Sequence, residues 1–178
     1  MFHFIYRLVL TFNATSWIIV IHGIKEEWAV WCLPAWATSI AMLLIPVLVS
    51  LLSIPLTLLL SRDELKSCED VEEANNSFLP TYLGYFFIGL GVEKTSHLLL
   101  VYAIVFLFTH LTQSQYFNPL FLLFGYRYYH VTTRQKTKVL LISREQIRCP
   151  EGLRLPNLRR INNTTYIAWR RKDESADS

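Results

Sequence analysis

The feature that most limits how this chain can fold is a set of four long stretches without a charged residue, at positions 8–24, 36–60, 78–92 and 97–113. A helix rises about 1.5 Å per residue, so about 20 residues cross the roughly 30 Å hydrocarbon core of a bilayer. The second stretch reaches this length by itself, and the others need about one turn of flanking residues. We therefore predict four transmembrane helices, over residues 5–24, 36–60, 77–93 and 95–114.

Three of the stretches allow a second interpretation. Arg7 precedes the first apolar run, as a basic residue does in a secretion signal, but no small-residue cleavage motif follows Ile24, so we expect a retained span. The last two stretches could instead form a buried helical hairpin with its turn at residues 91–96. The short loops favour two membrane spans, because no polar segment nearby could form the outer face of such a hairpin.

The charged residues divide the chain into two chemically different parts. The whole chain of 178 residues is 52% hydrophobic, with a net charge of +3 and a mean hydropathy of +0.30. Residues 127–178 hold 12 of the 17 Lys and Arg residues and 5 of the 14 Asp and Glu residues, a net charge of +7, whereas residues 1–126 have a net charge of −4. This pattern is typical of a membrane protein with a small soluble appendage, and the length leaves no room for a second large catalytic lobe.

Lys and Arg residues also predict the orientation in the membrane. With both termini in the cytoplasm, the two outer loops contain only Lys25 and Lys94, and all other basic residues are cytoplasmic. The acidic loop at residues 61–76 then lies on the cytoplasmic side, as the basic tail does. The loop either contacts the tail or is simply solvated.

After the fourth span, the pattern changes from helical lengths to short β-like runs. Pro119 interrupts the helix, because proline has no backbone N–H. The aromatic segment at 116–126 is too short to span the bilayer, so we expect it at the level of the lipid headgroups.

Residues 127–178 form the basic tail, which is rich in strand patterns. The runs 127–133 and 138–143 predict one hairpin, and the runs 158–161 and 164–169 predict another across an Asn-Asn turn that tolerates a left-handed backbone. We expect a sheet or partly open barrel of four or five strands. The predicted fold class is a membrane α-helical protein, with four transmembrane helices and a small C-terminal cytoplasmic β-rich domain.

Polar residues inside the spans are expected to face protein or water, because lipid offers them no partner. In the second span they recur, together with a proline, at spacings that keep them on one helical stripe: Ser39, Pro46, Ser50, Ser53 and Thr57. The stripe either packs against a neighbouring helix or lines a pore. Pro46 and Pro55 each remove a backbone hydrogen bond, so we expect a bent helix. In the first span, Asn13 is the best candidate for a hydrogen bond between helices.

No motif for catalysis or cofactor binding is found. The Gly89-Leu90-Gly91 sequence lies inside a predicted span, where it favours close helix packing or a helix end. His97 and His110 point to different sides of their helix and so form no metal site together. The three cysteines have no metal-like spacing. We predict no catalytic, cofactor-binding or metal-binding residue and no enzymatic activity.

The basic tail carries the residues best suited to contact a partner or lipid. They combine aromatic rings with positive charge: Tyr128, Tyr129, Arg134, Lys136, Lys138, Arg159, Arg160 and Trp169. Such a surface could bind anionic lipids, an acidic protein, or nucleic acid through phosphates and base stacking. Because orientation in the membrane already explains the positive charge, direct contact with nucleic acid is the least favoured of the three.

The run YFNPLFLLFGYRYYHVTT at 116–133, followed by KVLLIS at 138–143, resembles the KwaA family, the membrane subunits of the Kiwa antiphage defence system. The likeness extends to the layout of four spans with a short β-rich tail, which is nearly the whole chain. It implies a multi-pass protein of the bacterial inner membrane that forms homo-oligomers and works with a soluble DNA-binding subunit. The run is structural rather than catalytic, so no functional residue is carried over.

Together, residues and resemblance predict a sensor and scaffold subunit. Its helices assemble with lipids and with other copies of the chain, and its cytoplasmic side recruits a soluble effector. The alternative is an oligomeric pore, lined by the stripe of the second span, whose opening depolarises the cell.

Overall fold

The computed structural model describes the chain in seven segments, residues 2–29, 33–65, 68–76, 79–112, 118–133, 135–147 and 155–169. The chain divides into a helical unit, His3–Pro55 with Ser77–Leu120, and a sheet unit, Leu56–Asn76 with Phe121–Ser178. Each unit therefore combines two separate parts of the sequence.

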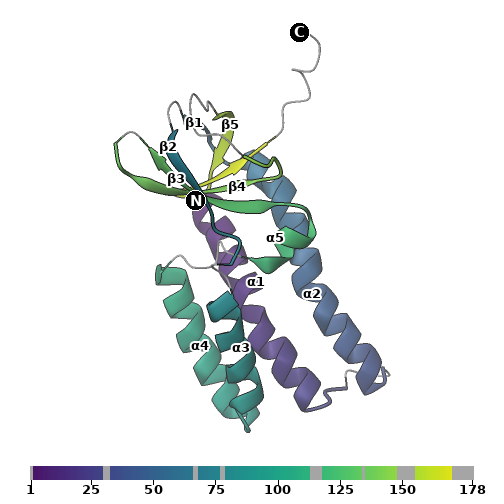
Figure 1. Ribbon diagram of the computed structural model, residues 1–178. Coiled ribbons are helices and arrows are strands. Elements are labelled where there is room, and N and C mark those ends of the chain that lie inside the picture. Colours follow the sequence, from purple (N-terminus) through teal and green to yellow (C-terminus); the bar gives the residue numbers. More distant parts are fainter. Residues whose placement is uncertain are drawn as a thin grey trace. The chain divides into compact units, whose positions relative to one another are not determined.

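The helical unit contains helices α1 (Phe2–Lys25), α2 (Ala35–Leu56), α3 (Leu79–Gly91) and α4 (Thr95–Thr112) (Figure 1). Among the described residues, three segments are long and apolar enough to cross a membrane: α1, α2 with its 3-10 extension, and α4. Helix α3 has 13 described residues, about 20 Å of helix, which is less than a full crossing. The apolar helices support a membrane protein, but the predicted count of four spans is not confirmed.

Helix α2 contains both prolines of the second predicted span. It continues through Pro46 and ends at Leu56, directly after Pro55. There the chain changes to the short 3-10 helix η1 (Thr57–Leu59). The proline near the end of the helix thus marks the change in helical geometry, because proline cannot donate the backbone hydrogen bond that an α-helix requires.

Helix α1 packs closely against α3 and α4. Ile18 of α1 is fully buried in a core with Tyr82, Tyr85 and Leu98. Gly89 lies so near to α1 that a Cβ atom there would be 2.9 Å from the carbonyl oxygen of Ile18. The close packing expected around this glycine is therefore present in the structure.

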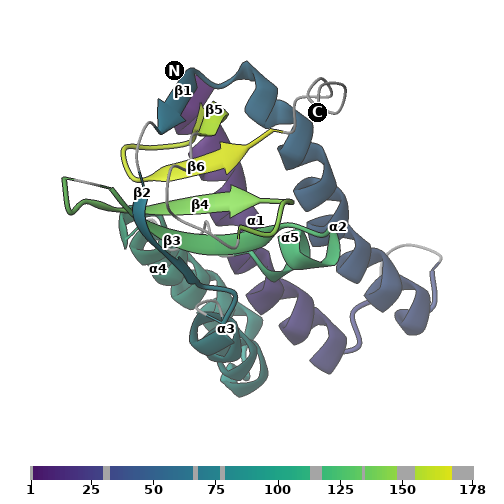
Figure 2. The same ribbon diagram turned by 45° about the horizontal axis from the view of Figure 1, so that its top comes forward.

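The described residues of the sheet unit form one mixed sheet of six strands in the order β1-β5-β6-β4-β3-β2 (Figure 2). The strands are β1 (Arg62–Leu65), β2 (Cys68–Glu73), β3 (Arg127–Thr133), β4 (Lys138–Ser143), β5 (Leu155–Arg160) and β6 (Thr165–Ala168). Both predicted hairpins are present, because β3 pairs with β4 and β5 pairs with β6 in antiparallel fashion. A parallel pairing of β4 with β6 joins the two hairpins.

The acidic segment at 61–76 is not a solvated loop. It forms β1, which pairs with β5, and β2, which pairs with β3, so it supplies both outer strands of the sheet. Its apolar residues Leu65, Cys68 and Val71 pack in the core of the sheet with residues of the tail. Because acidic residues are so frequent in this segment, its apolar face could not be recognised from the sequence.

The turns of the two hairpins differ in backbone conformation, and the left-handed backbone expected at Asn162-Asn163 is not found at Asn162. Asn162 closes the β5–β6 turn with its side chain, since Oδ1 accepts a hydrogen bond from the Thr164 N–H at 2.7 Å. Its backbone is not among the left-handed residues of the described chain. A left-handed conformation is found instead at Lys136, in the β3–β4 turn, with φ of 58°.

The aromatic segment before the sheet contains the short helix α5 (Pro119–Leu123). Gly125 follows with φ of 80°, a conformation that favours glycine. The rings of Phe121 and Tyr126 pack together with centroids 6.0 Å apart, and both are buried. These two rings therefore pack within the protein, and the position of the segment at the level of the lipid headgroups stays a prediction. Tyr116 and Phe117 lie outside the described residues.

Candidate functional site

A buried polar cluster joins α1 to the middle of α2. Asn13 Nδ2 donates a hydrogen bond to Ser50 Oγ at 2.6 Å, which is the interhelical bond expected for Asn13. Asn118 Nδ2 donates to the same oxygen at 3.0 Å. All three side chains are at most 1% exposed. We call these residues the Asn13–Ser50–Asn118 cluster.

Neighbouring hydroxyl groups support this cluster. Ser53 Oγ donates to the Ser50 carbonyl at 2.7 Å, and Ser16 Oγ donates to the Asn13 carbonyl at 2.7 Å. Tyr6 OH adds a second link between α1 and α2 by donating to the Ser53 carbonyl at 3.2 Å. Asn13 Oδ1 is buried and has no hydrogen-bond partner among the described residues. The cluster is thus closely connected, with one acceptor still free.

The predicted stripe of α2 packs within the chain. Four of its members are buried: Pro46, Ser50, Ser53 and Thr57. Ser39 is half-buried, and its hydroxyl donates to the Ala35 carbonyl of its own helix. The part of the stripe around Ser50 and Ser53 faces α1, as the packing interpretation requires.

Polar contacts that the sequence did not reveal link the other helices. Thr11 Oγ1 lies 3.1 Å from His110 Nδ1, and Thr15 Oγ1 donates to Tyr102 OH at 3.3 Å, so α1 is bonded to α4 at two levels. The hydroxyl groups of Tyr85 and Thr109 lie 2.9 Å apart, between α3 and α4. Asn118 was also missed, because before Pro119 it indicated only a helix break. Single polar residues carry no periodic signal that would identify such partners.

The outer surfaces of α2 and α4 are strongly apolar. Only 11% of the apolar segment Thr95–Thr112, which forms α4, is buried inside the protein. The most exposed large side chains of the two helices include Trp36, Leu48, Leu52, Leu99, Leu100, Phe108 and Leu111. Exposed apolar surface of this extent is unfavourable in water and suits contact with lipid.

Within the sheet unit, the chain leaving α2 is held by side chains from β5 and from the residue after β6. Trp169 Nε1 donates to Thr57 Oγ1 at 2.7 Å. Arg159 Nη1 donates to the Leu60 carbonyl at 2.9 Å, and Leu60 is buried. The tail residues Trp169 and Arg159 therefore bond to the end of the α2 segment.

Two of the predicted contact residues belong to the protein core. Tyr128 is 0% and Tyr129 is 3% exposed. Both lie on β3, which has a strand on each side, between β2 and β4. This corrects the prediction that they meet a partner or lipid at the surface. Aromatic residues in a short basic segment suggested stacking, but Tyr129 packs in the core of the sheet with Val131 and Leu141, and Tyr128 is fully buried.

The other predicted contact residues differ in their accessibility. Arg160 is half-buried and donates to the Asn162 carbonyl and to Asn163 Oδ1. Lys136 and Lys138 are exposed at the β3–β4 hairpin. Arg134 lies outside the described residues. Of the described basic candidates, the two lysines remain open to a partner.

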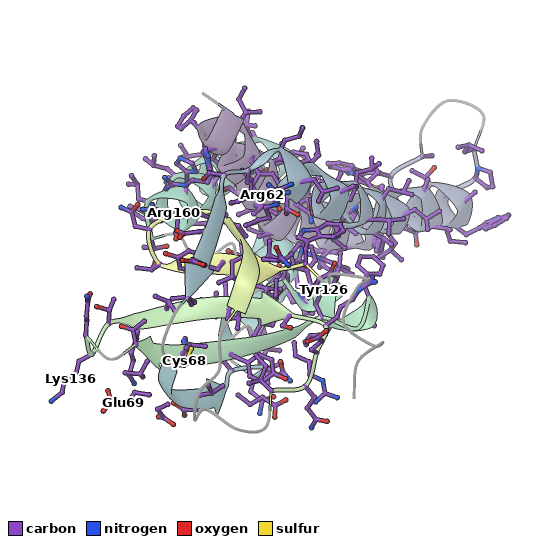
Figure 3. All side chains as sticks on the ribbon, turned by 90° about the horizontal axis from the view of Figure 1, so that it is seen from above. Arg62, Cys68, Glu69, Tyr126, Lys136 and Arg160 are labelled. Atoms are coloured by element: carbon purple, nitrogen blue, oxygen red, sulfur yellow. The ribbon has the colours of Figure 1, made fainter. Side chains whose placement is uncertain are left out.

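The opposite charge is concentrated on β2. Its side chains Glu69, Asp70, Glu72 and Glu73 are all exposed. Figure 3 shows Glu69 pointing away from the sheet. Glu73 Oε1 also lies 3.8 Å from Arg127 Nη1 of the neighbouring strand. This acidic strand was predicted only as part of a loop.

Burial changes the acid–base properties of two groups in the sheet unit. Burial raises the pKa of the Cys68 thiol, which lies in the core of the sheet. Burial also raises the pKa of Tyr166, as does the negative charge of Asp63, and the charge of Arg160 partly opposes this. Both groups are therefore held in their neutral forms.

Among the described residues, no three His, Cys, Asp or Glu side chains are grouped to bind a metal ion.

Comparison with known proteins identifies a family. The family model described as anti-phage protein KwaA matches residues 6–167. No significant match was found among curated proteins or among solved structures.

Proposed function

Because the chain belongs to the KwaA family of anti-phage proteins, and so has a role in antiphage defence, we propose that it is the membrane sensor and scaffold subunit of a defence complex. It lies in the bacterial inner membrane with both termini in the cytoplasm. Its helices assemble with other copies of the chain, and the sheet unit recruits a soluble DNA-binding effector.

The exposed apolar faces of the helices support placement in a membrane. Helices α1, α2 and α4 have the required length and hydropathy. The positive-inside rule favours a cytoplasmic sheet unit, because the tail carries most of the Lys and Arg residues.

The main support for the proposal is the set of hydrogen bonds along α2 and its 3-10 extension. One stripe of this segment bonds to α1 through Ser50 and bonds to Trp169 of the sheet unit through Thr57, seven residues later. A change in the packing of α1 against α2 would therefore alter a segment that is directly connected to the sheet. This gives a membrane disturbance a physical route to the cytoplasmic side.

The pore alternative receives less support from the same contacts. Ser50 and Ser53 are fully buried against α1, so they are not available to line a channel in this arrangement. Purified protein in liposomes distinguishes the two functions. A sensor and scaffold gives no ion flux above that of empty liposomes, whereas a pore gives flux that Ser50→Leu changes.

Recruitment is tested by co-expressing the chain with the soluble subunit of its defence system and separating membranes from cytosol. We expect the soluble subunit in the membrane fraction only when the chain is present. A soluble subunit that remains in the cytosol, while the chain itself is in the membrane, would contradict the scaffold function.

A further inference from the structure

Strand β2 is an outer strand of the sheet. In the strand order it is the last member, and its described partner is β3. Outer strands present unpaired backbone N–H and C=O groups, which can accept a further strand from another chain.

The register identifies which backbone groups face outward. The Ala74 N–H donates to the Tyr128 carbonyl at 2.8 Å, towards β3. Backbone groups alternate in direction along an antiparallel strand, so those of Glu72 also point to β3. Those of Val71 and Glu73 therefore point to the open side of the sheet. Asn75 Oδ1 accepts the Tyr128 N–H at 2.8 Å, which ends the pairing with β3.

The side chains of β2 restrict what can pair there. Four of its six residues are acidic and exposed. Like charges that lie opposite each other across two strands destabilise the pairing. Antiparallel pairing of β2 with β2 of a second copy would set several acidic residues against each other. The strand is therefore poorly suited to bind another copy of itself and well suited to bind a basic segment.

We propose that β2 binds an extended, Lys- or Arg-rich segment of a protein partner as an additional strand. Backbone hydrogen bonds to Val71 and Glu73 hold the segment, and basic side chains at alternate positions lie beside Asp70 and Glu72. Strand addition of this kind takes affinity from the main chain and specificity from side chains. The inference rests on the proposed scaffold function, for which it names the contact surface and the chemistry of the partner.

The first test uses the full-length chain in detergent and a fluorescent peptide of alternating Thr and Lys. A Pro and Lys peptide of equal length and charge is the matched probe, because proline cannot pair as a strand. We expect the Thr and Lys peptide to bind and to slow hydrogen exchange of the Val71 and Glu73 amides. The proline peptide should bind at least about tenfold more weakly and give no protection.

The matched protein variants reverse charge on the two outer strands of the sheet. The double variant Asp70→Lys with Glu72→Lys should lose about tenfold or more in affinity for the Thr and Lys peptide. Glu64→Lys on β1, at the opposite side of the sheet, should bind as the wild type does. Equal affinity of the double variant, or binding without amide protection on β2, would overturn the proposal.

Two further outcomes would assign the edge to another occupant and also overturn the proposal. Protection of β2 without peptide that disappears when residues 170–178 are removed would mean that these residues of the chain itself occupy it. Protection that disappears on dilution would mean a second copy. The membrane recruitment experiment distinguishes the β2 contact surface from the scaffold function. Loss of recruitment only in the Asp70→Lys and Glu72→Lys variant supports β2 as the contact surface. Full recruitment of this variant refutes the contact surface alone, and no recruitment by the wild type refutes the scaffold function.

Discussion

Asn13 Nδ2 donates a hydrogen bond to Ser50 Oγ across 2.6 Å, from the interior of one apolar helix to the interior of another. Asn118 donates to the same oxygen. One hydroxyl group therefore connects three segments that lie far apart in the sequence.

Replacement of Ser50 by Ala should destabilise the helical unit. The change removes the acceptor of two buried amide groups, and each unsatisfied buried group costs about 1–3 kcal/mol. Thermal unfolding of the purified protein in detergent measures the effect. Ser39→Ala is the control, because Ser39 is half-buried and bonds only within its own turn, and we expect a change of about 0.5 kcal/mol or less. Equal losses of stability in the two variants would contradict the role of Ser50.

Gly89→Val should loosen the packing of α3 against α1. An added Cβ would lie 2.9 Å from the backbone oxygen of Ile18 and 2.9 Å from Ile21 Cβ, so the helices must move apart. Overpacking of this kind costs about 1–3 kcal/mol. The matched control is Gly84→Val on the same helix, where nothing lies within 4 Å of the added atom. A control that is destabilised as much as Gly89→Val would show that helix propensity, rather than close approach, determines the result.

The Thr57–Trp169 hydrogen bond is best tested by a double-mutant cycle. Trp169→Phe and Thr57→Val each remove one partner while keeping most of the side-chain volume. We expect each to lower the free energy of unfolding by about 0.5–1.5 kcal/mol, and the double variant to lose less than the two losses together. Strictly additive losses would mean that the two side chains do not interact in solution.

Cys68 should react slowly with a thiol reagent in the folded protein. Burial raises its pKa above the ordinary value of 9.0, so at any pH below that value less thiolate is present than in the unfolded chain. The folded protein therefore holds the thiol proton more tightly than the unfolded chain does. The contribution of this group to the free energy of unfolding is fully present below the unfolded pKa and is lost as the pH rises through the folded pKa. Alkylation of a Cys32→Ser, Cys149→Ser variant, followed by mass spectrometry at pH 7 and after unfolding, measures the difference. Equal rates in the two states would contradict burial of Cys68.

The sequence predicted those parts of the fold that have a periodic pattern. Long charge-free runs located the apolar helices. Short runs of strand-forming residues separated by polar turns located the two hairpins from β3 to β6, with the β3–β4 pair at residues 127–133 and 138–143. The spacing around Ser50 and Ser53 indicated a polar stripe that packs against a helix or lines a pore. Asn13 was expected to bond between helices, but its partner Ser50 was not identified.

Other features depend on contacts between distant residues and could not be predicted. The strands β1 and β2 are too acidic to resemble core strands, and only their pairing with β5 and β3 buries Leu65 and Cys68. Tyr128 and Tyr129 looked like surface rings because their burial depends on side chains from distant parts of the chain, such as Cys68 and Leu158 beside Tyr129. The role of Asn118 likewise becomes visible only when Ser50 lies beside it.

The measurement that most directly tests signalling through α2 is the plating efficiency of phage on bacteria that carry the complete defence system. The strains should contain the wild type, Ser50→Leu or Ser39→Leu at equal abundance in the membrane. We predict that Ser50→Leu abolishes protection, because it breaks the Asn13–Ser50–Asn118 cluster, and that Ser39→Leu protects as the wild type does. Full protection by Ser50→Leu would contradict the proposed coupling between helix packing and the sheet unit.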